Sequence, residues 1–205
     1  MSRRLVLKAA GAVVAAAALC AVGAAIYQSR TRHPKRFIAV VPGRIYRSGQ
    51  PDPAQLDRIA REKGFKTLVN LRREDRWLHD PNCVYEREFA EKHGIRFVGL
   101  ALDLPPTEEQ IRQVLDLLDD DRHCPVLVHC SAGVERSGMV AAIYRVERMG
   151  WSNERALEEL LANGVDKEVR EHSQPLAYVE FLRTYRPHFP KQPKATPAPV
   201  VGGGK

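Results

Sequence analysis

The feature that most constrains this chain is a short apolar run that leads through a turn of small residues into a helical pattern. Val126 to His129 is rich in β-branched residues, which is typical of a buried strand. After Arg136, apolar residues recur at three- and four-residue spacing, which predicts a helix: Met139, Val140, Ile143, Val146 and Met149. A strand, a tight loop and a helix N-terminus in this order can bind an anion, because loop N–H groups converge on it and the helix dipole favours negative charge.

Cys130 stands where the predicted strand ends and the loop begins. The helix N-terminus and a nearby arginine favour the thiolate form of such a cysteine, and the thiolate is the nucleophile. Arg136, six positions later, offers a planar fork to two phosphate oxygens, and Ser137 offers a hydroxyl to the departing thiolate. A structural core cysteine is the usual interpretation of a lone cysteine, but these residue types at fixed offsets favour phosphate chemistry.

His129, Cys130, Arg136 and Ser137 match the signature of the protein tyrosine phosphatase superfamily, which is HC, five residues, R, then S or T. The segment IYRSGQP, residues 45–51, resembles the start of many bacterial dual-specificity-like phosphatase domains. The resemblance extends from about Gly43 to Arg186. It implies a metal-free phosphomonoesterase that forms a phosphocysteine on Cys130, with His129 orienting the loop. The implied phosphate-binding residues are Ser131, Ala132, Gly133, Val134, Glu135 and Arg136.

The chemistry also needs a proton donor for the leaving oxygen and later a base for water. In the superfamily an aspartate about thirty residues before the cysteine has this role, and Asp103 lies 27 residues before Cys130, just after a predicted strand. We therefore expect Asp103 to be the general acid, with a turn or helix-capping role as the alternative. The LPP that follows Asp103 departs from the polar residues that are commoner there.

Substrate class is less constrained than the reaction. Relatives that act on phosphoinositides or inositol pyrophosphates often carry Lys or Arg inside the loop, whereas this loop carries Glu135. A carboxylate beside a polyanion is unfavourable, so a phosphoprotein is the expected substrate and a lipid or inositol phosphate the alternative. An inactive phosphate-binding module and a rhodanese-like or arsenate-reductase-like thiol enzyme are the other hypotheses.

A charged segment, Arg72 to Arg76, follows the predicted strand Thr67–Leu71. Ligands bind beyond the carboxyl ends of parallel strands, so this segment is expected to be a loop at the pocket rim, where Arg72 or Arg73 could contact substrate. A solvated run of charges is an equally weighted alternative. Cys83 is expected to be a structural thiol rather than a resolving partner for Cys130.

The flanks differ in composition from the centre of the chain. Residues 1–36 and 187–205 hold ten Lys or Arg and no acid, which leaves 22 basic and 25 acidic residues in 37–186. The domain itself is therefore slightly acidic, and nothing in it indicates nucleic-acid binding. Residues 9–27 are uncharged and apolar, and together with SRRLVLK, which resembles a twin-arginine motif, they predict a membrane anchor or an export signal.

The expected organisation is a signal or anchor at 1–27, a basic linker at 28–36, a catalytic domain at 37–186 and a disordered tail at 187–205. The expected fold is α/β, with a central, mostly parallel sheet flanked by helices. The predicted helices are 53–63, 81–93, 136–149, 153–162 and 174–185, with a further helix capped by Thr107. We expect a monomer without a cofactor, its catalytic domain exported.

Overall fold

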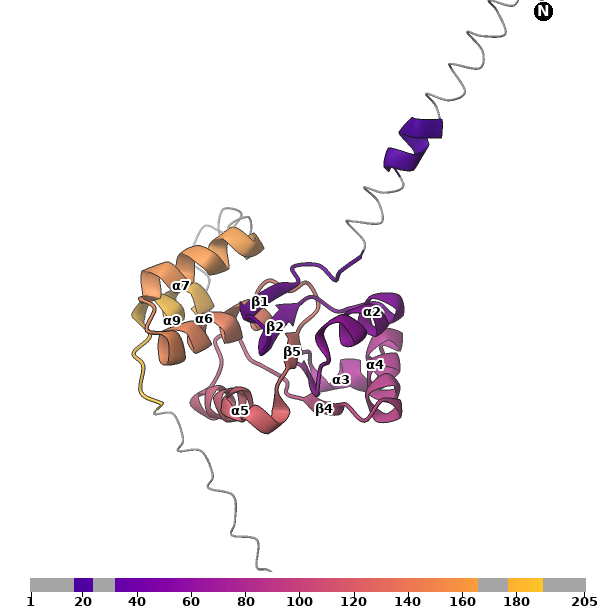
Figure 1. The fold of residues 1–205 in the computed structure, drawn as a ribbon. Coiled ribbons are helices and arrows are strands. Elements are labelled where there is room, and N and C mark those ends of the chain that lie inside the picture. Colours follow the sequence, from indigo (N-terminus) through magenta and orange to yellow (C-terminus); the bar gives the residue numbers. More distant parts are fainter. Residues whose placement is uncertain (1–16, 24–31, 166–176, 190–205) are drawn as a thin grey trace, which may run out of the picture.

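A computed structural model describes residues 17–23, 32–165 and 177–189 of the chain, and in it five short strands form a single sheet (Figure 1). The strand order is β1-β2-β5-β3-β4. Only β1 runs antiparallel to its neighbour, so the prediction of a mostly parallel sheet in an α/β fold is confirmed. The strands are β1 Ile38–Val41, β2 Ile45–Ser48, β3 Thr67–Asn70, β4 Arg96–Gly99 and β5 Val126–His129.

Helices cover both faces of the sheet (Figure 1). Residues 17–23 are helical, and the helices of the domain are α2 Pro53–Lys63, α3 Glu74–His79, α4 Pro81–Lys92, α5 Glu108–Asp119, α6 Arg136–Met149, α7 Asn153–Leu160 and α9 Ala177–Thr184. A 3₁₀ turn, Asp121–His123, precedes β5, and a single π-helical turn, Leu161–Val165, follows α7.

Helix ends follow the sequence signals closely. The hydroxyl of Thr107 accepts from Gln110 N while the Gln110 side chain reaches back to Thr107 N, so the predicted capping box begins α5. Asp52 and Gln55 make the same box at the start of α2, which ends at Gly64 in the left-handed region. Local capping chemistry therefore fixes where these helices begin and end.

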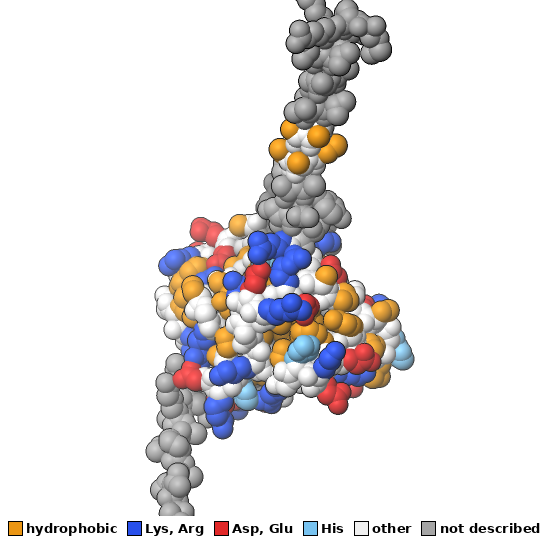
Figure 2. Space-filling model, turned by 45° about the vertical axis from the view of Figure 1, so that its right-hand side comes forward, with side chains coloured by type: hydrophobic (Ala, Val, Ile, Leu, Met, Phe, Trp, Pro, Cys, Tyr) orange, Lys and Arg blue, Asp and Glu red, His pale blue; other side chains and the backbone are white. Residues whose placement is uncertain are grey.

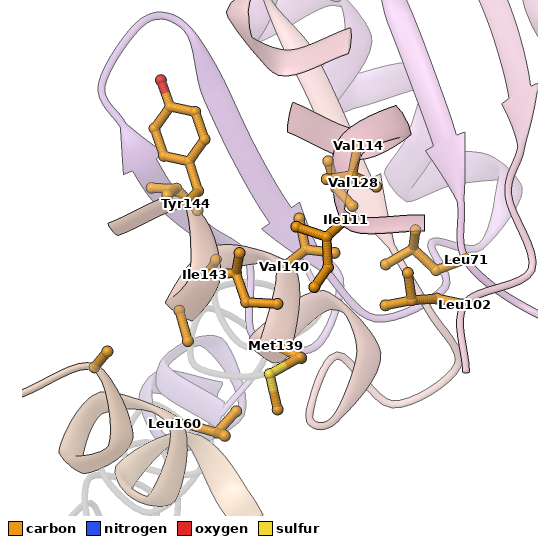
Figure 3. Close-up of a cluster of buried hydrophobic side chains, with 14 of the residues drawn as sticks. Leu71, Leu102, Ile111, Val114, Val128, Met139, Val140, Ile143, Tyr144 and Leu160 are labelled. Atoms are coloured by element: carbon orange, nitrogen blue, oxygen red, sulfur yellow. The ribbon is translucent and has the colours of Figure 1, made fainter. Parts of the chain in front are cut away.

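Two apolar clusters hold the helices on the sheet. On one face β5 and β3 pack against α5, α6, α7 and α9, and on the other they pack against α2 and α4. Figure 3 shows the first cluster, in which Val140 and Ile111 meet Val128 of the central strand. All four residues of β5 are buried, because neighbouring strands flank it on both edges and helices cover both faces.

The sequence prediction was wrong for two elements. Residues 74–79 form the helix α3 rather than a loop; its first turn carries Glu74 and Asp75 and its last carries Arg76 and His79, as the helix dipole favours. Strand β2 was not predicted, because a buried Arg47 interrupts its apolar pattern. Burial of this arginine depends on partners that are distant in sequence.

The predicted N-terminal membrane or signal segment, residues 9–27, lies mostly outside the described residues. Within the described ranges, no helix is both long enough and apolar enough to cross a membrane. On the face of the domain shown in Figure 2, Lys and Arg side chains are interspersed with Asp and Glu. This mixture agrees with the balanced charge counted over residues 37–186.

Candidate active site

The candidate site lies where the parallel strands end. Ser48, His129, Asn70 and Gly99 are in register at the carboxyl ends of β2, β5, β3 and β4. The segments that follow these strands therefore emerge at one edge of the sheet, as expected for ligand sites in open α/β sheets. Cys130 follows the central strand, so its loop lies in the middle of this edge.

Cys130 is held between β5 and the start of α6. Its side chain is 4% exposed, and its Sγ lies 3.5 Å from Ser137 Oγ. Ser48 O accepts from both Ser137 Oγ, at 3.2 Å, and Cys130 N, at 3.4 Å. The Ser137 hydroxyl can therefore donate to either Ser48 O or Cys130 Sγ, and it can turn to the sulfur when the sulfur carries negative charge.

The loop 131–135 turns its carbonyl groups outward. Ser131 O accepts from Gln50 N at 2.9 Å, Ala132 O from Arg36 NH1 at 3.0 Å, and Gly133 O from Arg47 NH1 at 3.0 Å. Because the N–H of a peptide points opposite to its C=O, the following amides point into the loop. Within the described part of the chain, the N–H groups of residues 132–134 have no acceptor. Three such donors facing one hollow form an anion-binding nest.

A close contact between two backbone segments fixes the shape of this loop. Gly133 has φ +73°, and a Cβ there would lie 2.4 Å from Gly49 N and 2.8 Å from Ser48 C. At Gly49 a Cβ would lie 3.0 Å from the backbone of Ala132. Both glycines are therefore needed where the turn after β2 supports the loop after β5.

Arg136 connects the loop to the segment that carries Asp103. Arg136 Nε donates to Leu102 O at 2.8 Å, and among the described residues its two terminal nitrogens have no partner. Asp103 is exposed, and its Oδ2 accepts from Gln110 Nε2 at 3.2 Å. The side-chain oxygen of Gln110 also accepts from Asp103 N at 3.3 Å. One side chain of α5 therefore contacts both the backbone and the carboxylate of Asp103.

Beneath the loop lies a buried contact between a carboxylate and an imidazole. Glu86 Oε1 and His129 Nε2 approach to 2.6 Å, both side chains are fully buried, and neither atom has another partner. His129 Nδ1 lies 3.3 Å from Cys130 O. His129 therefore lies between Glu86 and the carbonyl of Cys130, and it connects helix α4 to the residue that follows β5.

Glu86 also belongs to a polar network that continues to the segment after β3. Asn70 Nδ2 donates to Glu86 Oε2 at 3.1 Å, and Gln50 Nε2 lies 3.4 Å from the same oxygen. Arg72 donates to Gln50 Oε1 at 3.1 Å and to Asp80 Oδ2 at 2.7 Å. The network joins the ends of β2 and β3 to helix α4, so it holds the support of the loop rather than the loop itself.

Arg47 is a buried cation behind the loop. Its side chain is 2% exposed, and burial lowers the pKa of its guanidinium, while the negative charges of Glu159 and Cys130 act in the opposite direction. Among the described residues its Nε has no hydrogen-bond partner. Arg47 thus adds positive charge behind the loop 131–135.

The structure brings together most of the residues that the sequence predicted. Cys130, the loop 131–135, Arg136 and Ser137 lie together between β5 and the start of α6, and His129 contacts the carbonyl of Cys130. Asp103 lies on the neighbouring segment that Arg136 contacts. Arg72 is held by Gln50 and Asp80, while Arg73 is exposed and pairs with Asp75 at 3.4 Å. The proposed contact of Arg72 or Arg73 with substrate stays a prediction.

Sequence reasoning missed five residues that support this site: Arg36, Arg47, Gln50, Glu86 and Gln110. One of them had a usable signal, because Glu86 falls at helical spacing with the buried Cys83, Phe89 and Ala90. No group of three His, Cys, Asp or Glu side chains in the described ranges could hold a metal ion.

Comparison with known proteins gives a consistent assignment. A family described as "DSP-PTPase phosphatase fused to NAD+ Kinase" matches residues 31–176. Dual specificity protein phosphatase TpbA of Pseudomonas aeruginosa is 30% identical over 126 residues, which is 60% of this chain and 53% of TpbA. Inositol diphosphatase DSP4 of Arabidopsis thaliana is 30% identical over 124 residues, which is 56% of this chain and 58% of DSP4. The chain thus spans little more than half the length of these relatives.

Among solved structures, the core catalytic domain of the PP-IP phosphatase SIW14 from Saccharomyces cerevisiae, in complex with citrate, has a similar fold. The TM-score is 0.62 at 20% identity, and the match covers 75% of this chain and 87% of that domain. At this level of identity the similarity concerns the arrangement of strands and helices.

Proposed function

This chain belongs to the DSP-PTPase phosphatase family, and from that premise and the site geometry we propose that it hydrolyses phosphomonoesters of proteins through a phosphocysteine on Cys130. One observation carries the proposal: the carbonyls of residues 131–133 are all bonded from outside the loop, so the three amides that follow them face the hollow next to Cys130. This arrangement suits a tetrahedral oxyanion and needs no metal ion.

The first step transfers the phosphoryl group to the protein. The phosphate binds in the nest, and Arg136 grips two of its oxygens with the terminal nitrogens that its Nε–Leu102 contact leaves available. The Cys130 thiolate attacks phosphorus, a sulfur–phosphorus bond forms and the bond to the leaving oxygen breaks. Asp103, in its protonated form, gives its proton to that oxygen.

The second step releases phosphate. Water attacks the phosphocysteine, and Asp103, now a carboxylate, accepts the proton of that water. The sulfur–phosphorus bond breaks and Cys130 leaves as a thiolate. Ser137 lies 3.5 Å from the sulfur and can turn its hydroxyl toward the developing charge. Phosphate then leaves the nest.

Turnover of p-nitrophenyl phosphate by the full chain, purified in detergent, tests this proposal. We expect hydrolysis that Cys130→Ser abolishes. Cys124→Ser is the matched control, because that buried thiol lies near the opposite end of β5, and it should retain activity. For Asp103→Asn we expect a much lower kcat and a flattened basic limb of the pH profile, since that limb reports loss of the acid's proton. A wild-type chain without turnover would leave the inactive phosphate-binding module as the better hypothesis.

A second candidate substrate is an inositol phosphate, because DSP4, which the chain resembles, is named an inositol diphosphatase. Glu135 supports the phosphoprotein instead, since a carboxylate at the start of α6 repels a crowded polyanion. The two substrate classes are separated by comparing kcat/KM for a phosphotyrosine peptide and for an inositol pyrophosphate. We expect the peptide to be preferred, and Glu135→Lys to shift the ratio toward the polyanion.

The N-terminal run 9–27 supports a proposal about location. Nineteen uncharged residues that follow SRRLVLK suit a membrane anchor or an export signal, which would place the catalytic domain outside the cytoplasm. A fusion of residues 1–36 to a reporter that is active only after export gives the test. An inactive, cytoplasmic fusion would exclude export.

A further inference from the structure

Arg36 lies just before β1 and contacts the phosphate loop from outside. Its NH1 donates to Ala132 O at 3.0 Å, and its Nε donates to Asn163 O at 2.6 Å, in the turn that follows α7. One guanidinium therefore joins three segments that are far apart in the sequence: the residues before the sheet, the catalytic loop and the turn after α7. Arg36 touches neither Cys130 nor the hollow of the nest in any described contact.

The surroundings of Arg36 are shaped to hold it. Arg36 has φ +54°, the only positive φ of a non-glycine residue among the described residues. Such a backbone persists only where neighbouring contacts enforce it, and it is often found at functional sites. Gly164 gives the guanidinium its space, because a Cβ there would lie 2.6 Å from Arg36 NH2.

The residues around Arg36 are bound to the domain at several points. Gly49 N donates to Lys35 O at 2.7 Å, Pro34 is buried, and the rings of His33 and Phe37 stack at 5.3 Å. The segment that carries Arg36 is thus anchored beside the turn after β2, which itself supports the loop. These contacts fix the guanidinium relative to Ala132 O.

The bond to Ala132 O has a consequence for phosphate binding. The carbonyl of Ala132 belongs to the same peptide as the N–H of Gly133, so a cation on the oxygen holds that N–H toward the hollow and polarises it as a donor. Arg47 does the same for the next peptide through Gly133 O. The loop amides are therefore oriented from behind by two guanidinium groups.

We propose that Arg36 is a positioning residue of the phosphatase site, which holds the catalytic loop in its phosphate-binding form through Ala132 O and Asn163 O. The inference rests on the proposed function. It extends the functional unit to a residue that lies ahead of the predicted domain boundary at 37. It also makes the segment before the sheet part of the active site's support.

Arg36→Met in the full chain is the test, since it removes both donors but keeps an unbranched side chain at an exposed position. Arg32→Met is the matched control: this arginine lies in the same segment but pairs with Glu62, away from the loop. Gly164→Ala is a second variant, because its methyl group would displace the guanidinium. Since Gly164 has φ +117°, alanine also adds backbone strain there, so the free energy of unfolding is measured for this variant as well.

Two measurements are compared for each variant: kcat and KM for p-nitrophenyl phosphate across pH, and the dissociation constant of inorganic phosphate by calorimetry. For Arg36→Met and Gly164→Ala we expect kcat/KM and phosphate affinity to fall about tenfold or more, because a misdirected oxyanion donor costs rate as well as binding. The acidic limb of the pH profile should move to higher pH, since a less positive loop stabilises the thiolate less. Arg32→Met should stay within about twofold of wild type in every measurement.

The possible outcomes distinguish the positioning role of Arg36 from the proposed phosphatase function. Wild-type activity, phosphate affinity and pH profile in Arg36→Met would overturn the positioning role and leave the proposed function intact. A wild-type chain that binds phosphate without turnover, and loses that binding in Arg36→Met, would support the positioning role and overturn the proposed function. A wild-type chain that neither binds nor turns over would overturn both.

Discussion

Replacement of Gly133 by alanine should inactivate the site while leaving the fold in place. In the left-handed conformation at φ +73°, a new Cβ would lie 2.4 Å from Gly49 N and 2.8 Å from Ser48 C. Both neighbours are backbone atoms, so no flexible side chain can move aside. The loop that carries the nest amides and the turn after β2 must therefore separate.

The size of the effect follows from these distances and from a matched control. Gly43 has the same φ of +73°, but a Cβ there meets nothing within 4 Å. Both substitutions carry the cost of a left-handed alanine, about 1–2 kcal/mol in the free energy of unfolding. Only Gly133→Ala adds the clash, which requires a displacement of about 1 Å to restore an ordinary contact of 3.4 Å. A misplacement of about 1 Å at a reacting centre costs about 100-fold in rate.

The assay compares kcat/KM for p-nitrophenyl phosphate with the free energy of unfolding in urea for the two variants. We expect both to lose similar stability from the backbone term, and Gly133→Ala to lose about 100-fold in kcat/KM while Gly43→Ala keeps wild-type activity. If Gly133→Ala retained wild-type kcat/KM, the close support of the loop by the turn after β2 would not be required for the reaction. Equal losses of activity in both variants would also refute the reasoning.

Three further predictions follow from the contacts around the loop. Gln110→Leu should lower kcat several-fold with little change in KM, because it removes the hydrogen bond that orients the carboxylate of Asp103. Gln113→Leu, also on α5, should leave kcat unchanged, and equal effects of the two substitutions would contradict this prediction. Glu86→Gln should lower the free energy of unfolding by about 1–3 kcal/mol, because it replaces a buried carboxylate that Asn70 and His129 contact, whereas the exposed Glu88→Gln should change it little; equal values from denaturant titration would contradict this. Burial raises the pKa of the Cys83 thiol, so in the unfolded chain it ionises first as the pH rises through about 8.5. Stability should therefore fall above that pH, and less steeply in Cys83→Ser; an identical pH dependence would argue against this.

The sequence identified the residues that the structure places together at the candidate site more completely than it identified the residues that support them. Cys130, Arg136 and Ser137 lie within eight residues of one another, and the strand, loop and helix that hold them are set by local pattern. Asp103 was reached by its place after a strand and by resemblance to a known family, and the structure adds that Arg136 Nε contacts the preceding residue. The capping boxes at Asp52 and Thr107 show the same dependence on near neighbours.

The residues that hold the loop could not be predicted from local sequence patterns. In the sequence, Arg47 only interrupts an apolar pattern. In the structure β2 pairs with β5, and the Arg47 guanidinium donates to Gly133 O. In the sequence, Glu86 is one of several acidic residues on a predicted helix. In the structure this helix packs against the sheet, and Glu86 contacts His129. In each case a charged side chain is buried because a partner lies nearby in space and far away in sequence.

The amino-acid sequence alone determined the chemistry of this protein: a thiol, an arginine and a hydroxyl at fixed spacing between a strand and a helix, which local hydrogen bonding and periodicity place correctly. The tertiary structure decided which way the loop faces. Arg36 and Arg47 reach it across 96 and 86 residues of sequence, and they meet it only because β2 pairs with β5 in the sheet. The order of strands depends on burying both faces of the sheet at once, so no local pattern reveals it.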